Sequence, residues 1–189
     1  MKVSIGVSNR HVHLKKEHLD ILFGEGYVLQ KRNDLNQPGQ FAAVETVTIK
    51  TSKSNIDNVR ILGPLRDYTQ VEISMTDAYK LGLNPPVRES GDLNGSSPIT
   101  IIGPKGEINL EEGCIIATRH IHLTKKQAEL YGLEGKKSVS VKLNGEKGGI
   151  INNVSLKVSR RDLAYFELHL DTDDANAHLV KSGDIGEIL

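Results

Sequence analysis

The stretch Arg10-His11-Val12-His13-Leu14 (RHVHL) indicates how this fold is organised, because it recurs as RHIHL at residues 119–123. A weaker likeness continues at the same offset, and the segments 61–64 (ILGP) and 101–104 (IIGP) echo each other at a different spacing. Internal self-similarity of this kind indicates repeated structural units. We therefore expect two related β units, each entered or left through an Arg-His-x-His-Leu segment. The flanking matches are Lys16 with Lys125, Glu25 with Glu134 and Gly26 with Gly135.

Residue usage favours β structure. Val, Ile and Thr together number 40 against 8 Ala, and β-branched residues prefer strands whereas alanine prefers helices. Turn signals such as Gly63-Pro64 and Asn144-Gly145 separate the apolar runs. Many short strands with close turns are typical of sandwiches or small barrels, so we expect a mainly β fold. The expected strands are 3–7, 43–50, 57–62, 69–74, 98–103, 107–110, 114–117, 138–143, 149–158, 165–170 and 185–188.

Helices are expected to be few and short, and to cover barrel ends rather than to form a core. One spans 15–23, one spans 77–81 after a capping Thr76, and one spans 125–131 after Thr124. A fourth spans 173–181, capped by Thr172 or Asp173. The segment 84–97 carries several turn signals and is expected to be a surface loop, either covering a site or simply connecting strands.

Length and composition restrict the class of protein. A chain of 189 residues and 20.8 kDa has room for one large domain or two of about 90 residues each. Its 24 basic and 24 acidic side chains balance, which argues against a general electrostatic affinity for nucleic acid or membrane. The single cysteine excludes an intramolecular disulfide and indicates a reducing compartment. With no secretory signal and no apolar run of about 20 residues, we expect a cytoplasmic globular protein.

The two His-x-His pairs are the strongest chemical signal. Side chains alternate along an extended chain, so His11 and His13 point to one side and can bind one metal ion. The same holds for His120 and His122. The alternative is a structural repeat in which these histidines hydrogen-bond the backbone.

A zinc site would need further ligands, because zinc takes three or four and a catalytic site leaves one position open. In 69–74, Val71 and Ile73 alternate toward a core, which turns Glu72 to the opposite face. In 165–170 the same alternation leaves Glu167 and His169 opposite the apolar residues. Each of these side chains also fits an ordinary solvated strand position.

Arginines beside a metal suggest an anionic substrate. Arg66 follows the turn Gly-Pro-Leu just before the strand of Glu72, and a guanidinium offers a rigid fork of donors to phosphate or carboxylate. The alternative is a surface salt bridge, and Arg10 and Arg119 are open to either interpretation.

Longer motifs carry a resemblance to a known family. RHVHL, DLNQPGQFAAVETV (34–47), VRILGPLRDYTQVEIS (59–74), NPPVRESGDL (84–93), ATRHIHL (117–123) and ELHLDTDDANA (167–177) closely resemble the PduL-type phosphate propanoyltransferases. These are zinc-dependent acyltransferases associated with bacterial microcompartments and propanediol degradation. The resemblance implies two small β-barrel domains capped by short α-helices. One domain would cover 10–117 and the other 1–9 plus 118–189, completed by the N-terminal strand, with both His-x-His segments at the domain interface.

The resemblance also implies a site, residue by residue. One zinc ion would be held by His11, His13 and Glu72, and a second by His120, His122 and His169, about two per chain. Arg66 would bind phosphate, and Ser8, Arg60, Leu62 and Asn176 would contact coenzyme A.

The implied reaction is reversible and has no need of a side-chain nucleophile. Propanoyl-CoA, or alternatively acetyl-CoA, and phosphate would give the acyl phosphate and coenzyme A at a dinuclear zinc site between the barrels. The expected partners are acyl-CoA and phosphate, with neither nucleic acid nor membrane. Family members destined for a microcompartment often carry an N-terminal helical extension, and this chain begins directly at its first strand, so no targeting segment is expected.

Two other functions fit the same ligands. A dinuclear zinc hydrolase would use water as its nucleophile and release the free acid. A non-catalytic β-barrel binding module would use the histidines for a structural metal. No sequence pattern indicates the acyl-chain preference or whether the chain forms a homo-oligomer.

Overall fold

The computed structural model describes residues 1–159 and 161–189 and confirms a mainly β protein with 45% strand and 15% helix. It divides into two compact units, each of which contains a closed six-stranded barrel. We call Arg10–Ala117 the central unit, and Met1–Asn9 with Thr118–Leu189 the terminal unit, since the latter holds both ends of the chain. No helix among the described residues is long and apolar enough to cross a membrane.

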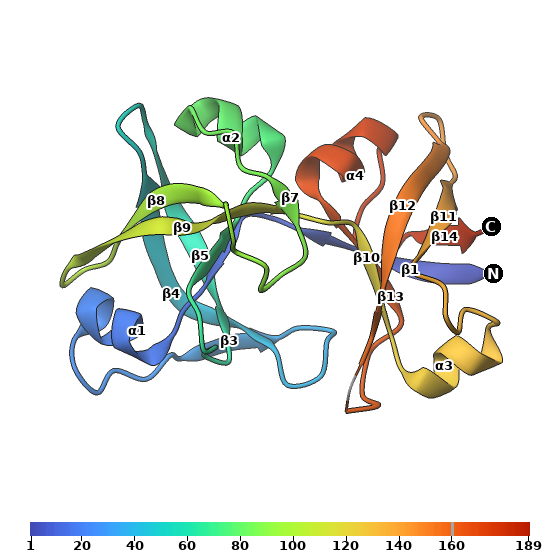
Figure 1. Ribbon diagram of the computed structural model, residues 1–189, viewed down its shortest axis with the longest axis horizontal. Coiled ribbons are helices and arrows are strands. Elements are labelled where there is room, and N and C mark those ends of the chain that lie inside the picture. The colour runs from blue at the N-terminus through green and yellow to red at the C-terminus, as the bar shows by residue number, and fades with distance from the viewer. Residues whose placement is uncertain (160) are drawn as a thin grey trace. The chain divides into compact units, whose positions relative to one another are not determined.

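In the central unit the barrel strands follow the order β4-β5-β2-β6-β9-β8, and β8 closes the ring by pairing with β4 (Figure 1). The short strands β3 and β7 extend this sheet beside β4 and β9. Helix α1 contacts β9 and α2 contacts β5. The elements are β2 His11–His13, α1 Lys16–Phe23, β3 Lys31–Asp34, β4 Phe41–Lys50, β5 Asn55–Gly63, β6 Gln70–Glu72, α2 Met75–Leu81, β7 Val87–Arg88, β8 Ser97–Ile102 and β9 Glu107–Ala117.

In the terminal unit the closed barrel follows the order β1-β13-β10-β12-β11-β14. The N-terminal strand β1 is part of this ring, where it pairs in parallel with β13 and antiparallel with β14. Helix α4 contacts both β1 and β13. The elements are β1 Lys2–Ser8, β10 His120–Leu123, α3 Lys125–Leu130, β11 Ser138–Leu143, β12 Gly149–Val158, β13 Glu167–Asp171, α4 Thr172–His178 and β14 Ile185–Ile188.

The two barrels share one pairing scheme. In each, the His-x-His strand runs parallel to one neighbour (β2 with β5, β10 with β12) and antiparallel to another (β2 with β6, β10 with β13). The antiparallel neighbour then pairs in parallel with the next strand, β6 with β9 and β13 with β1. The internal repeat in the sequence therefore corresponds to a repeated supersecondary structure.

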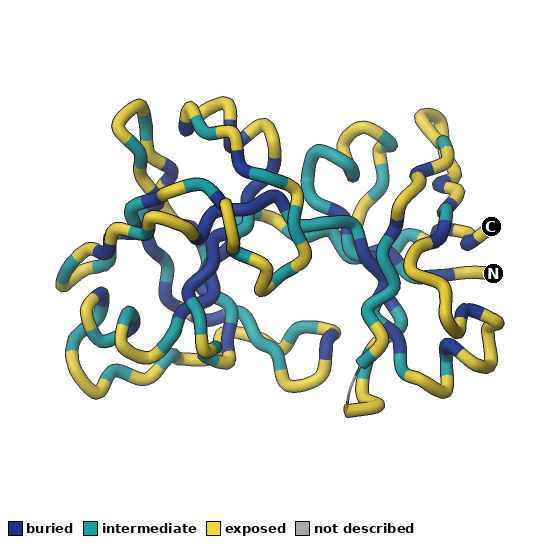
Figure 2. The backbone as a smooth tube through the Cα atoms, in the orientation of Figure 1, coloured by how far each residue is buried: buried dark blue, intermediate teal, exposed yellow. Residues whose placement is uncertain are grey.

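Alternation of apolar and polar residues builds each core. Along β4 the buried residues Ala43, Val47 and Ile49 face inward, and along β1 Val3 and Ile5 do the same. Figure 2 shows buried stretches along the strands and exposed stretches at most of the turns. The buried apolar residues form two separate clusters, one in each unit, so each barrel has a hydrophobic core of its own. Each aliphatic side chain that folding fully buries contributes roughly 1.5–3 kcal/mol to the stability of its barrel.

Several element boundaries differ from the predictions, most clearly at two helix caps. Helix α2 is capped by the hydroxyl of Ser74, which accepts from the Asp77 backbone N–H, so it starts two positions before the predicted segment. Helix α4 is capped by Asp171 instead of Thr172 or Asp173. The predicted strands 107–110 and 114–117 form a single strand, β9, and the segment 84–97 contains the two-residue strand β7. The cap predicted at Thr124 is present, with Gln127 completing a capping box.

Candidate metal centres

The central unit brings His11, His13 and Glu72 together. Strands β2 and β6 pair antiparallel with His11 directly opposite Glu72, and His13 lies two residues along the same face. The Nε2 atom of His11 lies 3.3 Å from Glu72 Oε2, and that of His13 lies 3.9 Å from Glu72 Oε1. Both histidines are buried. One ligand atom from each of the three residues lies within 4.8 Å of the others, which is the spacing of a metal-binding triad.

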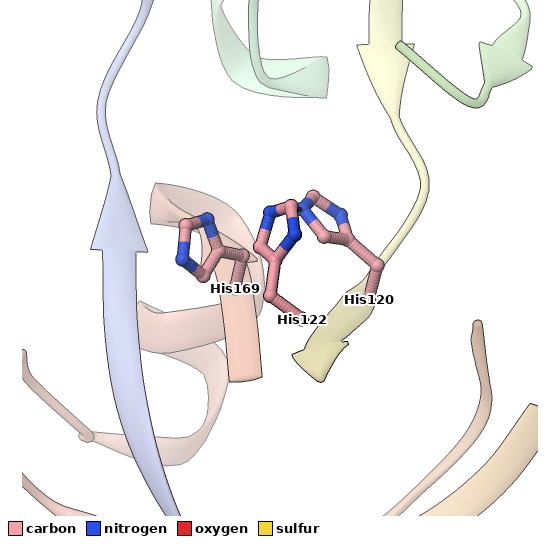
Figure 3. Close-up of side chains that lie close together, drawn as sticks. All are labelled: His120, His122 and His169. Carbon is pink, nitrogen blue, oxygen red and sulfur yellow. Dashed lines mark hydrogen bonds between the residues drawn. The ribbon is translucent and has the colours of Figure 1, made fainter. Parts of the chain in front are cut away.

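The terminal unit builds an equivalent triad from His120, His122 and His169. The pairing of β10 with β13 puts His120 opposite His169, just as His11 lies opposite Glu72. Figure 3 shows the three imidazole rings gathered at one place. Their centroids lie 4.8 to 5.0 Å apart. The Nε2 atoms of His120 and His122 lie 3.2 Å apart. Here, too, one ligand atom from each residue lies within 4.8 Å of the others.

Burial prepares these histidines for ligation. Removal from water lowers the pKa of His13 well below its usual value, and His11 and Arg66 lower it further. Burial likewise lowers the pKa of His120, assisted by Lys157 and His169. A neutral imidazole keeps the lone pair that a metal needs, so both side chains are in the metal-binding form at neutral pH.

Glu72 is held in its ionised form. Burial alone would raise its pKa, but the neighbouring His11, His13 and Arg66 outweigh burial and lower the pKa below the usual range. The central triad therefore combines two imidazoles with one carboxylate, whereas the terminal triad has three imidazoles. Both donor sets are ones that zinc uses in proteins.

Hydrogen bonding at the rings fits ligation. The Nδ1 of His120 donates to the carbonyl of Thr118 at 2.7 Å, which places the proton on Nδ1 and leaves the Nε2 lone pair facing His122. A backbone bond and a ligand role are therefore compatible for this residue. For His13, a backbone hydrogen bond with Leu62 favours the protonated ring, but burial outweighs it and keeps the pKa low.

Arg66 belongs to a polar network around the central triad. Its guanidinium donates to the hydroxyls of Tyr68 and Ser90, both at 2.9 Å. Gln70 donates to the same Ser90 hydroxyl at 2.8 Å and to Glu72 at 2.6 Å. Arg66 is half-buried, and its positive charge lowers the pKa of both Glu72 and His13. The segment 84–97, through Ser90, is thus part of the surroundings of this site.

The four residues predicted to contact coenzyme A are divided between the units. Ser8 ends β1 opposite Asp171, and Asn176 is exposed on α4, which contacts β1. Arg60 and Leu62 lie on β5, and Arg60 pairs in register with His11. The Arg60 guanidinium donates to the carbonyls of Ala43 and Val44 at 3.1 and 2.7 Å. The Arg60 side chain therefore also links β5 to β4 by hydrogen bonds.

Arg10 and Arg119, which precede the histidine pairs, form ion pairs with helices. Arg10 binds both carboxylate oxygens of Asp77 at 2.8 Å, and Arg119 Nε lies 2.7 Å from Asp174. Both aspartates occupy the third position of a short helix, α2 or α4. The sequence contains this repeated spacing, because Asp77 lies five residues after Glu72 and Asp174 five residues after His169. The likeness between the two His-x-His segments does not reveal this spacing, because those segments are 109 residues apart whereas Asp77 and Asp174 are 97 apart.

The two barrels, each with its triad, define a double-barrel protein with one candidate metal centre per barrel. A family profile described as phosphate propanoyltransferase matches residues 4–181 of the chain. Curated relatives that carry this name are 42–54% identical over nearly the whole chain. The chain therefore belongs to the phosphate propanoyltransferase family, a family of acyltransferases, which confirms the resemblance found in the sequence motifs.

Three relatives illustrate the match. The phosphate propanoyltransferase of Thermotoga maritima is 54% identical over 188 residues, which cover 99% of this chain and 89% of the relative. That of Lachnoclostridium phytofermentans is 50% identical over 189 residues, covering 99% and 87%. That of Alkaliphilus metalliredigens is 42% identical over 189 residues, covering 100% and 88%.

Proposed function

We propose that the chain is a zinc-dependent phosphate acyltransferase that interconverts a short-chain acyl-CoA plus phosphate with the acyl phosphate plus coenzyme A. Propanoyl-CoA is the proposed acyl donor, by the name that its relatives carry. The observation that carries the zinc dependence is the pair of triads, built on the same strand register in both barrels.

His11, His13 and Glu72 would hold one zinc ion, and His120, His122 and His169 a second. Bound zinc would supply Lewis acidity toward the thioester oxygen and an affinity for the departing thiolate sulfur. Each triad supplies three ligands, which leaves a position open for a reacting group, as catalytic zinc sites do.

Arg66 would bind and orient phosphate. In the reaction a phosphate oxygen forms a bond to the thioester carbon, the carbon–sulfur bond breaks, and the thiolate takes up the proton that hydrogen phosphate gives up. Phosphate is itself the nucleophile, so a nucleophilic side chain is unnecessary. The buried Cys114 fits this, because burial raises the pKa of its thiol to about 12 and keeps it unreactive.

Thiol release from propanoyl-CoA and from acetyl-CoA, measured with and without phosphate, tests this function. We expect thiol release only with phosphate, together with an equal amount of acyl phosphate trapped by hydroxylamine. Thiol release without phosphate would identify a hydrolase, and no release under any condition would identify a binding module. The ratio of kcat/KM for the two substrates would define the acyl preference, which one methylene changes by about 10–200-fold in an apolar pocket.

For the cellular setting we propose the bacterial cytoplasm, with packaging in a microcompartment for propanediol degradation as a separate hypothesis. Co-purification of the chain with microcompartment shells would support packaging, and its recovery entirely outside the shells would contradict it.

A further inference from the structure

A buried polar residue lies opposite the second histidine of each pair. The strand register puts Gln70 opposite His13 and Glu167 opposite His122. Gln70 is 0% exposed and Glu167 is 4% exposed. Each residue is two positions before the third member of its triad, Glu72 or His169, and therefore shares its face of the strand.

Each of these residues hydrogen-bonds that third member, with opposite polarity in the two barrels. In the central unit the amide Nε2 of Gln70 donates to the carboxylate of Glu72 at 2.6 Å. In the terminal unit the imidazole Nε2 of His169 donates to the carboxylate of Glu167 at 2.9 Å. A donor thus faces the carboxylate ligand, and an acceptor faces the imidazole ligand.

We propose that Gln70 and Glu167 are matched positioning residues, each of which fixes the orientation of the third metal ligand in its barrel. This inference rests on the proposed zinc sites. Glu167 keeps the proton of His169 on Nε2, so Nδ1 retains its lone pair for ligation. Glu167 also adds a carboxyl group beside a triad of three imidazoles, so that each barrel has one carboxyl side chain at its site, Glu72 or Glu167.

The surroundings of both residues support this role. A buried carboxylate is costly, and an apolar residue would fill the position of Glu167 at lower free energy. Space for it comes from Gly6 on β1, where an added Cβ would lie 2.8 Å from Glu167 Cδ. Gln70 uses both ends of its amide. Its Oε1 accepts from the Gly91 N–H at 2.7 Å, and its Nε2 donates to the Ser90 hydroxyl as well as to Glu72.

Zinc affinity measured by competition with a chromophoric chelator tests the proposal on the purified chain. The variants are Glu167→Gln, Glu167→Ala and Gln70→Ala, with the exposed Glu129→Gln and Gln30→Ala as matched controls in the same units. Loss of an outer-shell partner typically costs 10–100-fold in metal affinity. We expect one of the two zinc ions to bind about 10–100-fold more weakly in each alanine variant, and the other ion and both controls to match wild type.

Glu167→Gln separates positioning from mere folding. Its amide oxygen still accepts from His169 but carries no charge, so the affinity should lie between wild type and Glu167→Ala. The visible spectrum of the Co²⁺-substituted variant should shift, because the imidazole that Glu167 polarises would be a ligand. Wild-type affinity and an unchanged Co²⁺ spectrum in folded variants would overturn the proposal while leaving the zinc sites in place. A wild-type chain that binds no zinc would instead overturn the zinc sites themselves, and this inference with them.

Discussion

Replacement of Arg66 by alanine should reduce the phosphate-dependent rate by about 10²-fold. The guanidinium is half-buried, with its charge close enough to His13 and Glu72 to lower the pKa of both. An anion placed there would gain charge and alignment from this side chain, and loss of one such contact costs on the order of 10²-fold. At 1.36 kcal/mol per tenfold, that is about 2.7 kcal/mol of transition-state stabilisation. Arg66→Lys restores the charge without the two-pronged geometry, so its rate should lie between the two.

Thiol release at varied phosphate concentration measures this effect. The loss should fall on kcat/KM for phosphate, while zinc content stays at the wild-type level because guanidinium is not a metal ligand. Arg88→Ala is a matched control, since Arg88 lies on the same segment as Ser90 and pairs with Asp92 at 3.6 Å. An unchanged phosphate dependence in Arg66→Ala would refute the proposed role, and an equal loss in Arg88→Ala would show that the effect is not specific to Arg66.

Three further outcomes follow from burial and charge. Arg10→Ala deprives the buried carboxylate of Asp77 of its ion-pair partner and should lower the free energy of unfolding by about 2 kcal/mol. The loss is smaller than for a fully buried pair because Arg10 itself is partly exposed. An unchanged urea midpoint would contradict this expectation. Cys114, with the pKa of its thiol raised to about 12, should resist alkylation at pH 8 in the folded chain and react after unfolding, whereas rapid modification of the folded chain would disprove its burial. The metal-free chain should lose stability as the pH falls below about 6.5, because the pKa values of His13 and His120 are lower in the folded chain than in the unfolded chain, which therefore takes up protons first. Urea unfolding at pH 7.5, 6.0 and 5.0 measures this loss. A free energy of unfolding that stays constant or rises toward pH 5 would contradict it.

The sequence predicts strand bounds well where a strand is long enough to show a repeat of apolar residues. The strands 138–143 and 149–158 have the predicted bounds, because apolar residues repeat along them and the turn at Asn144-Gly145 separates them. Strands of two or three residues, such as β7 and β2, are too short to show a period. Closure into barrels depends on pairings between distant segments, such as β4 with β8, which local patterns do not encode.

The residues of the candidate sites could likewise be predicted only where a single strand determines them. Alternation along the chain puts His11 and His13 on one face and turns Glu72 away from the core, and the structure brings these three side chains together. Alternation alone does not choose between Glu167 and His169, which share a face. That choice depends on the register that puts His120 opposite His169, a property of two strands and not of one.

The most direct test of the proposed function combines zinc analysis with turnover in one ligand variant from each barrel, His13→Ala and His122→Ala. The wild-type chain should contain about two zinc ions, and each variant should lose about one while circular dichroism shows an intact fold. Both variants should be nearly inactive in phosphate-dependent thiol release, because either site loses its Lewis acid when a ligand is removed. Wild-type protein that turns over without zinc, or wild-type activity in either variant, would contradict a reaction that needs both barrels.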